Sequence, residues 1–363
     1  MSLSCGIVGL PNVGKSTLFN AITRAGVAAS NYPFCTIDPN VGIVEVPDRR
    51  LAALAEIFAS KRIVPATTTF VDIAGLVRGA SAGEGLGNAF LSHIREVDAI
   101  AMVVRCFVDD NVVHVDGKTD ALRDIETIDI ELALADVATV DRRLDRSRQR
   151  KKADPSLAHE VTALENLRGA LDGGKPARAF PAASAEIALA KELQLLTAKP
   201  TLYVANVDEI GSRASNAAAE AVAERARTDG AECIALSAKL EAELAGMPDE
   251  EAEAFARDLG MDARGLDRLI VAAYRLLHLM TFLTAGEKET RAWTIEQGTK
   301  APQAAGKIHS DIERGFIRAE IASFGDLDRL RSLAAVREAG LLRVEGRDYV
   351  MQEGDVVNFR FNV

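Results

Sequence analysis

The chain has 363 residues, and 48% of them are hydrophobic, which is enough to build a sizeable core divided among two or three domains. Its formal net charge of −10 argues against binding of nucleic acid through the whole surface, so a contact with a polyanion needs a local basic patch. The four cysteines are widely separated and form no C-x-x-C pair, which argues against a disulfide framework or a zinc site.

No basic segment followed by a long apolar run marks the N-terminal region, and no later stretch stays apolar long enough to span a bilayer. We therefore expect a cytoplasmic protein that makes no membrane contact.

The first 25 residues predict a strand, a loop and a helix. An apolar run from Leu3 to Leu10 is followed by a glycine-rich turn and by apolar residues at helical spacing between Ser16 and Ala25. Strand-like segments then alternate with helical segments, which indicates a parallel sheet with crossover helices and the α/β class. These strand-like segments are residues 42–46, 67–73, 100–107, 201–207 and 233–236.

The alternation stops between residues 119 and 196, where long stretches rich in Ala, Leu, Glu and Arg are broken at 154–155 and at 173–176. Two antiparallel helices in a coiled-coil hairpin, inserted into the α/β domain, are the simplest interpretation. After a last helix near 266–279, β-rich segments at 291–295, 316–321 and 356–361 predict a small α+β domain. The predicted domains are 1–125 with 197–280, then 126–196, and finally 281–363.

Residues 9–16 read G-L-P-N-V-G-K-S, which is the phosphate-binding pattern G-x-x-x-x-G-K-[ST] between a strand and a helix. The glycines let backbone N–H groups converge on an anion, and the helix contributes its positive end. A chance glycine-rich turn is the alternative. The predicted phosphate contacts are Asn12, Val13, Gly14, Lys15, Ser16 and Thr17, with Lys15 on the β and γ phosphates.

Mg²⁺ should accompany the phosphates, with the Ser16 hydroxyl as one ligand. Asp72 ends the strand in F-V-D-I-A-G and is the carboxylate expected in the metal shell, while Gly75 is the glycine expected to contact the γ-phosphate. Thr36 lies in the loop between the first helix and the next strand and is the candidate third ligand; an ordinary loop threonine is the alternative.

The base should be recognised after the strand at 201–207. GTPases of this architecture carry N-K-x-D there, whereas this chain has Asn206-Val207-Asp208-Glu209. The longer Glu209 displaces the carboxylate that would pair with guanine, at a cost of about 1–3 kcal/mol, so adenine can compete. Asp208 could instead take over the guanine contact. Ser237 begins an S-A-K segment that should lie behind the base and support it.

Leu76 occupies the position of the glutamine that orients the attacking water in many related enzymes. An apolar side chain cannot do this, so either turnover is slow or another group acts. His93 and His114 flank the region; for each, a structural or surface role is the alternative.

Taken together, these stretches resemble the Obg-related ATPases of the YchF and Obg-like ATPase group. The resemblance rests on residues 6–20, 31–40 and 70–88 and on the C-terminal segments R-A-W-T-I, A-P-Q-A-A-G-K-I-H and G-D-V-V-N-F-R-F-N-V. It implies a P-loop NTPase domain with an inserted helical hairpin and a C-terminal TGS domain of the β-grasp type.

The resemblance also implies an enzyme that prefers ATP or accepts both ATP and GTP through Asn206 and Glu209. It favours His114 over His93 as the catalytic group beside Lys15. In potassium-stimulated relatives an asparagine at the position of Asn12 helps to hold K⁺, although Asn12 could equally be a turn former.

Association with ribosomes and a role in translation or stress responses follow from the same resemblance. The basic run at residues 141–152 lies near the expected tip of the hairpin and, together with the TGS domain, is the candidate contact with ribosomal RNA; for the basic run, the alternative is a solvated face. The competing functions are a nucleotide-switched binding module with negligible turnover and a GTPase that tolerates Glu209.

Overall fold

The computed structural model describes residues 3–25, 40–73, 75, 86–109, 119–208, 216–259 and 264–362. The chain divides into two compact units: Met1–Ile43 with Thr69–Ala273, and Val44–Thr68 with Tyr274–Val363. The polypeptide therefore passes between the units at three places in the sequence.

The first unit is built on a six-stranded sheet with the order β2-β4-β1-β5-β6-β7. Its strands are β1 (Ser4–Val8), β2 (Val41–Glu45), β4 (Thr67–Asp72), β5 (Ala99–Arg105), β6 (Thr201–Asn206) and β7 (Cys233–Leu236). The pairs β1–β4, β1–β5, β5–β6 and β6–β7 are all parallel. Every residue of β5 is buried, as expected for a central strand covered on both faces. The predicted α/β class is confirmed.

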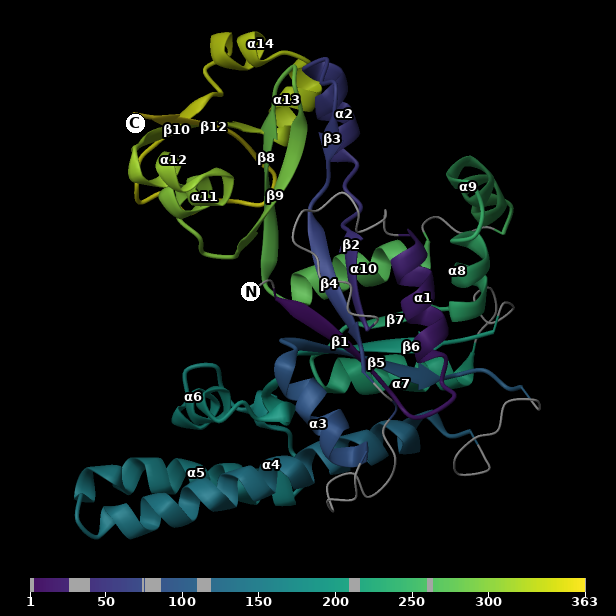
Figure 1. The fold of residues 1–363 in the computed structure, drawn as a ribbon, viewed down its shortest axis with the longest axis vertical. Coiled ribbons are helices and arrows are strands. Elements are labelled where there is room, and N and C mark those ends of the chain that lie inside the picture. Colours follow the sequence, from purple (N-terminus) through teal and green to yellow (C-terminus); the bar gives the residue numbers. More distant parts are fainter. Residues whose placement is uncertain are drawn as a thin grey trace. The chain divides into compact units, whose positions relative to one another are not determined.

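Helices cover both faces of this sheet. They are α1 (Lys15–Ala25), α3 (Leu86–Glu96), α7 (Ala217–Thr228), α8 (Ala238–Leu244) and α10 (Gly265–Leu276), and α9 (Asp249–Asp258) packs on α8. Figure 1 shows α1, α8 and α10 on one side of the sheet and α3 and α7 on the other. Among the helices of the described ranges, none combines the length and the apolar character that crossing a membrane requires.

The helical insertion contains α4 (Ala121–Lys151), α5 (Ala158–Asp172) and α6 (Ala185–Glu192), with short 3₁₀ turns at Pro155–Leu157, Ala177–Ala179 and Leu196–Ala198. The α4 and α5 helices form the expected antiparallel hairpin (Figure 1). A two-helix prediction was incomplete, because α6 packs on α5 and closes a separate apolar core. This core is formed by Val140, Leu144, Val161, Leu164, Leu167, Leu171, Ala177, Ile187, Ala190 and Leu195.

One buried carboxylate fixes the base of the insertion. Asp136 on α4 is fully buried and accepts hydrogen bonds from the backbone N–H groups of Leu196 and Thr197, both at 2.8 Å, and from the Thr197 hydroxyl at 2.7 Å. Burial raises the pKa of Asp136 above its usual value, although the hydrogen bonds from Leu196 and Thr197 oppose this shift. The returning chain is thus held against α4 immediately before it enters β6.

The second unit carries another six-stranded sheet, with the order β11-β10-β12-β8-β9-β3. Its elements are α2 (Arg50–Ile57), β3 (Ile63–Val64), β8 (Leu279–Ala285), β9 (Thr290–Glu296), α11 (Ala301–Ile308), α12 (Ser310–Arg314), β10 (Phe316–Ser323), α13 (Phe324–Leu330), α14 (Leu333–Glu338), β11 (Arg343–Glu345) and β12 (Asp355–Phe361). The C-terminal strand β12 lies parallel to β8 and antiparallel to β10, which is β-grasp topology. Apolar residues of this sheet and α11 form its core.

Residues 44–68 belong to this second unit, although the sequence placed them in the nucleotide-binding domain. The physical reason is strand pairing: β3 lies parallel to β9, with Ile63 opposite Thr290 and Val64 opposite Arg291. The segment before β3 adds a hydrogen bond from Lys61 N to Glu287 O at 3.0 Å. Only two residues long, β3 carries too little periodicity for its partner to be predicted.

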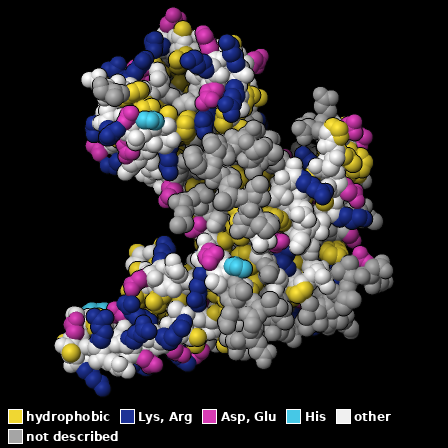
Figure 2. Space-filling model, in the orientation of Figure 1, with side chains coloured by type: hydrophobic (Ala, Val, Ile, Leu, Met, Phe, Trp, Pro, Cys, Tyr) yellow, Lys and Arg dark blue, Asp and Glu magenta, His cyan; other side chains and the backbone are white. Residues whose placement is uncertain are grey.

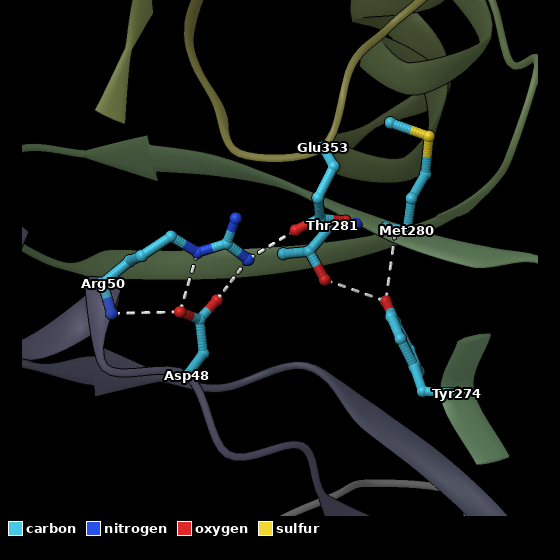
Figure 3. Close-up of polar contacts among 6 residues, drawn as sticks. All are labelled: Asp48, Arg50, Tyr274, Met280, Thr281 and Glu353. Atoms are coloured by element: carbon cyan, nitrogen blue, oxygen red, sulfur yellow. Dashed lines mark hydrogen bonds and ion pairs between the residues drawn. The ribbon is translucent and has the colours of Figure 1, made fainter. Parts of the chain in front are cut away.

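A polar cluster joins this early segment to the C-terminal sheet (Figure 3). The Arg50 guanidinium donates to both oxygens of Asp48 at 2.8 and 2.7 Å and contacts Glu353 Oε1 at 2.6 Å. Glu353 Oε2 in turn accepts the N–H of Thr281 on β8 at 2.7 Å. Burial alone would lower the pKa of Arg50, but Asp48 and Glu353 raise it above its usual value. Arg50 therefore stays charged and links two segments that are distant in sequence.

Replacing Arg50 with Ala should destabilise the second unit by about 2 kcal/mol, because the Asp48 carboxylate, only 10% exposed, loses its partner. Urea denaturation followed by tryptophan fluorescence would measure this, since Trp293 lies in the same unit. Asp348→Ala is the control: it removes an ion pair with Lys300 whose carboxylate is 97% exposed, and should change stability by less than about 0.5 kcal/mol. Equal effects of the two variants would contradict the argument.

Candidate functional site

The turn between β1 and α1 has the conformation of a phosphate-binding loop. Asn12 and Gly14 have positive φ angles of 61° and 96°. At Gly14 a Cβ atom would lie 2.3 Å from the Asn206 side-chain nitrogen, so only glycine fits there. Asparagine tolerates the left-handed region, which accounts for Asn12 as a turn former. The first residues of α1 follow at once, so the N-terminus of the helix faces the loop.

Lys15 is held over this loop. Its side chain is buried and its ammonium donates to the carbonyl oxygen of Leu10 at 2.7 Å. Burial lowers the pKa of Lys15 to about 8, and the nearby charge of Asp72 opposes this shift. A Cβ atom at Gly75 would lie 3.1 Å from the Lys15 ammonium, so the backbone of Gly75 also approaches the lysine closely. The site thus presents a desolvated cation beside the glycine that the sequence placed at the γ-phosphate.

Two of the three predicted metal ligands lie together. The Ser16 hydroxyl is 3.4 Å from Asp72 Oδ2, at the end of β4. Burial raises the pKa of Asp72 above its usual value, although the Lys15 charge and the Ser16 hydroxyl oppose this shift. A hydroxyl and a partly desolvated carboxylate side by side form a pair of hard oxygen donors, which suits Mg²⁺. Thr36, the third predicted ligand, lies outside the described residues.

A cavity of about 420 Å³ adjoins the phosphate loop. It is lined by Gly14, Thr17, Phe107, Val108, Asp109, Asn206, Val207, Asp208, Ser237, Ala238 and Lys239. The lining combines an aromatic ring, aliphatic side chains and a few polar groups, which is the composition of a site for a planar base. Five predicted contacts are therefore brought together here: Gly14, Thr17, Asn206, Val207 and Ser237. Glu209, the predicted specificity residue, lies outside the described residues.

Asn206 connects the two halves of this arrangement. Its Nδ2 donates to the carbonyl oxygen of Val13 at 2.8 Å, and its Oδ1 accepts the N–H of Ala238 at 2.9 Å. The side chain is 4% exposed. Both ends of the amide are thus engaged within the protein, so Asn206 supports the site by joining the phosphate loop to the S-A-K segment. Ser237 is the N-cap of α8, since its hydroxyl accepts the N–H of Leu240.

The two candidate histidines differ in what the structure describes. His93 is on α3 with an exposed side chain, as expected for a surface residue. His114 and Leu76 lie outside the described residues. Sequence reasoning missed Phe107, Val108 and Asp109 as lining residues of the cavity. One signal was available: Arg105 is a charged residue at the end of an otherwise apolar, fully buried strand.

Nucleotide affinity should depend on pH through Lys15. Bound phosphates favour the ammonium form, so binding above pH 8 requires uptake of a proton. The affinity should change by no more than about twofold from pH 7 to 8 and fall by more than about tenfold from pH 8 to 9.5. Calorimetry in buffers of different ionisation enthalpy would detect the proton uptake. Lys15→Met should bind weakly at every pH without this slope. Equal wild-type affinity at pH 7 and pH 9.5 would overturn the prediction.

Comparison with known proteins places this site in context. Residues 4–148 match the family MMR_HSR1, described as 50S ribosome-binding GTPase, and residues 279–362 match the family YchF-GTPase_C, described as a protein of unknown function. The chain is 54% identical over 366 residues to the Ribosome-binding ATPase YchF of Bacillus subtilis (strain 168), and 50% identical over 364 residues to the protein of the same name from Escherichia coli O157:H7. Both alignments cover 100% of each chain.

A solved structure shares the whole architecture. The structure of the Schizosaccharomyces pombe YchF GTPase superposes with a TM-score of 0.88 at 40% identity, covering 99% of this chain and 98% of that chain. The names of these relatives differ in the nucleotide, ATPase for the bacterial proteins and GTPase for the Schizosaccharomyces pombe protein.

Proposed function

The chain belongs to the YchF family of P-loop nucleoside triphosphatases, and we propose that it is a ribosome-associated, Mg²⁺-dependent ATPase. The observation that carries the proposal is the grouping of Lys15, Ser16 and Asp72 around one phosphate loop, beside a cavity of the right composition for a base.

The chain's own residues perform the binding and charge compensation. Backbone N–H groups of the loop and the start of α1 bind the β and γ phosphates, and Lys15 neutralises the charge that develops between them. Ser16 and Asp72 would hold Mg²⁺, which supplies further charge stabilisation on the phosphates when bound, with Thr36 as the proposed third ligand. His114 is the proposed group that orients water in place of the usual glutamine.

ATP is the proposed substrate because Glu209 replaces the aspartate that would pair with guanine. Equilibrium binding of fluorescent ATP and GTP analogues in Mg²⁺ and K⁺ should show ATP bound more tightly by about tenfold or more, equivalent to about 1.4 kcal/mol. Glu209→Asp should shift the preference toward GTP. Preference for GTP in the unmodified protein would mean that Asp208 reads guanine and would make the protein a GTPase.

The ribosome contact is proposed to lie on the helical hairpin, where Figure 2 shows Lys and Arg side chains gathered. Not every cation there is available. Arg143 pairs with Glu160 at 2.8 Å, and Arg148 pairs with Glu165 at 2.8 Å. The exposed cations toward the turn that remain for a polyanion are Arg146, Arg150, Lys151 and Lys152.

Replacing these four residues with Ala should weaken co-sedimentation with ribosomes and reduce the slope of log affinity against log salt by about three, because up to four phosphate contacts are lost. The double variant Arg148→Ala, Glu165→Ala is the matched control, since it alters the same surface without changing net charge. Unchanged ribosome binding by the fourfold variant would refute the hairpin as the contact.

A nucleotide-switched binding module is the second candidate, favoured by Leu76 in place of the catalytic glutamine. ATP turnover with and without ribosomes, and with K⁺ or Na⁺, separates the two. Stimulated turnover that His114→Ala abolishes without loss of ATP binding supports the enzyme. Turnover that stays negligible under every condition supports the module.

A further inference from the structure

The loop that forms one side of the base cavity contributes no fully buried side chain at its three lining positions. Residues 106–109 follow β5 and supply Phe107, Val108 and Asp109 to the lining. Val108 is 83% exposed, so it cannot anchor the loop by burial. Polar contacts to the loop backbone therefore help to hold this wall, beside the buried Cys106 at its start.

Arg105 makes two of these contacts. It is the last residue of β5 and is only 2% exposed. Its Nε donates to the Phe107 carbonyl oxygen at 3.2 Å, and an Nη donates to the Asp109 carbonyl oxygen at 3.1 Å. The same guanidinium lies over the Phe107 ring, 4.5 Å from its centroid. One planar cation thus holds the backbone of the loop and one face of its aromatic side chain.

Further hydrogen bonds fix the start of the loop. The N–H of Cys106 donates to the Asn206 carbonyl oxygen at 2.8 Å, and the Asn216 side chain donates to the Cys106 carbonyl oxygen at 2.8 Å. Asn216 is also the N-cap of α7. Cys106 is therefore tied to β6 and α7, whereas Arg105 contacts both Phe107 and Asp109. A change at Arg105 should release the wall without disturbing the phosphate loop.

We propose that Arg105 is a positioning residue for the nucleotide base: it sets the Phe107 ring as a stacking surface for the purine. This deepens the proposed function and rests on it. A guanidinium suits the role because its fork reaches two carbonyl groups at once while its plane stacks on an aromatic ring. Lysine retains the charge but supplies neither the fork nor the flat surface. A preordered ring spares the nucleotide the entropy cost of ordering it on binding.

The test compares a ligand that has a base with one that lacks it. Arg105→Lys should weaken Mg-ATP binding between about 5-fold and 100-fold, the range expected for loss of one base–aromatic stack. Binding of Mg-tripolyphosphate, which occupies only the phosphate loop, should change by less than about twofold. Arg95→Lys is the matched control: the same substitution in the same unit, at an exposed arginine on α3 that contacts Thr139.

A double-mutant cycle with Phe107→Ala separates positioning from general support of the fold. Once the ring is absent, Arg105→Lys should cause little further loss of ATP affinity. Undiminished ATP binding by Arg105→Lys would overturn the inference, as would parallel loss of tripolyphosphate binding or a full additional loss in the Phe107→Ala background. If the wild type binds tripolyphosphate but binds ATP no more tightly, the base site fails and the phosphate site stands. If it binds neither, the proposed function itself fails.

Discussion

The nucleotide site depends on one constraint, namely that parallel strands deliver their carboxyl ends to the same edge of a sheet. The strands β1, β4, β5, β6 and β7 end respectively at the phosphate loop, Asp72, Arg105, Asn206 and the S-A-K segment. No two of these features need be close in sequence. Asn206 then fixes the distance between phosphate loop and base cavity, because one amide reaches Val13 on one side and Ala238 on the other. A buried amide with both ends satisfied cannot shift without leaving a polar group unpaired.

The sequence was informative wherever function is carried by a local pattern. The glycine spacing before Lys15 requires a positive φ at Gly14, and the structure has it, so the loop could be predicted without knowledge of the fold. The α/β alternation and the hairpin were predictable for the same reason, since strand and helix periodicities are local. The charge at the end of an apolar strand singles out Arg105, but its role could not be predicted, because its partners are backbone carbonyl groups two and four residues ahead, which carry no residue signature.

The assignment of residues 44–68 to the second unit shows the same limit at the level of domains. A two-residue strand and a helix of eight residues have no pattern that reveals their partner. Their place is decided by pairing with β9 and by the Arg50 contact with Glu353, a residue about three hundred positions later in the chain. The chain passes from the first unit to the second within β2 and returns to the first unit within β4, the strand that ends at Asp72. The strand after the predicted loop of Thr36 and the strand that ends at Asp72, the proposed metal ligand, are therefore both continuous in sequence with the second unit.

The helical insertion is attached to the sheet unit through contacts of charged side chains rather than through strand pairing. The Asp136 carboxylate accepts three hydrogen bonds from Leu196 and Thr197. Two residues after Thr197, the Lys199 ammonium donates to the carbonyl oxygens of Arg95 and Val97 at the end of α3. Cations at a helix C-terminus are favourable because carbonyl groups there lack partners within the helix. Burial lowers the pKa of Lys199 below its usual value, although the charges of Asp98 and Asp136 oppose this shift. Asp136 thus fixes the end of the insertion against α4, and Arg225 on α7 pairs with Asp129 on α4 at 2.6 Å, so the base of the hairpin is held by polar contacts that would leave unsatisfied groups if they were broken. That makes the base of the insertion a rigid joint, whereas the exposed basic residues at its far turn are unconstrained by such contacts.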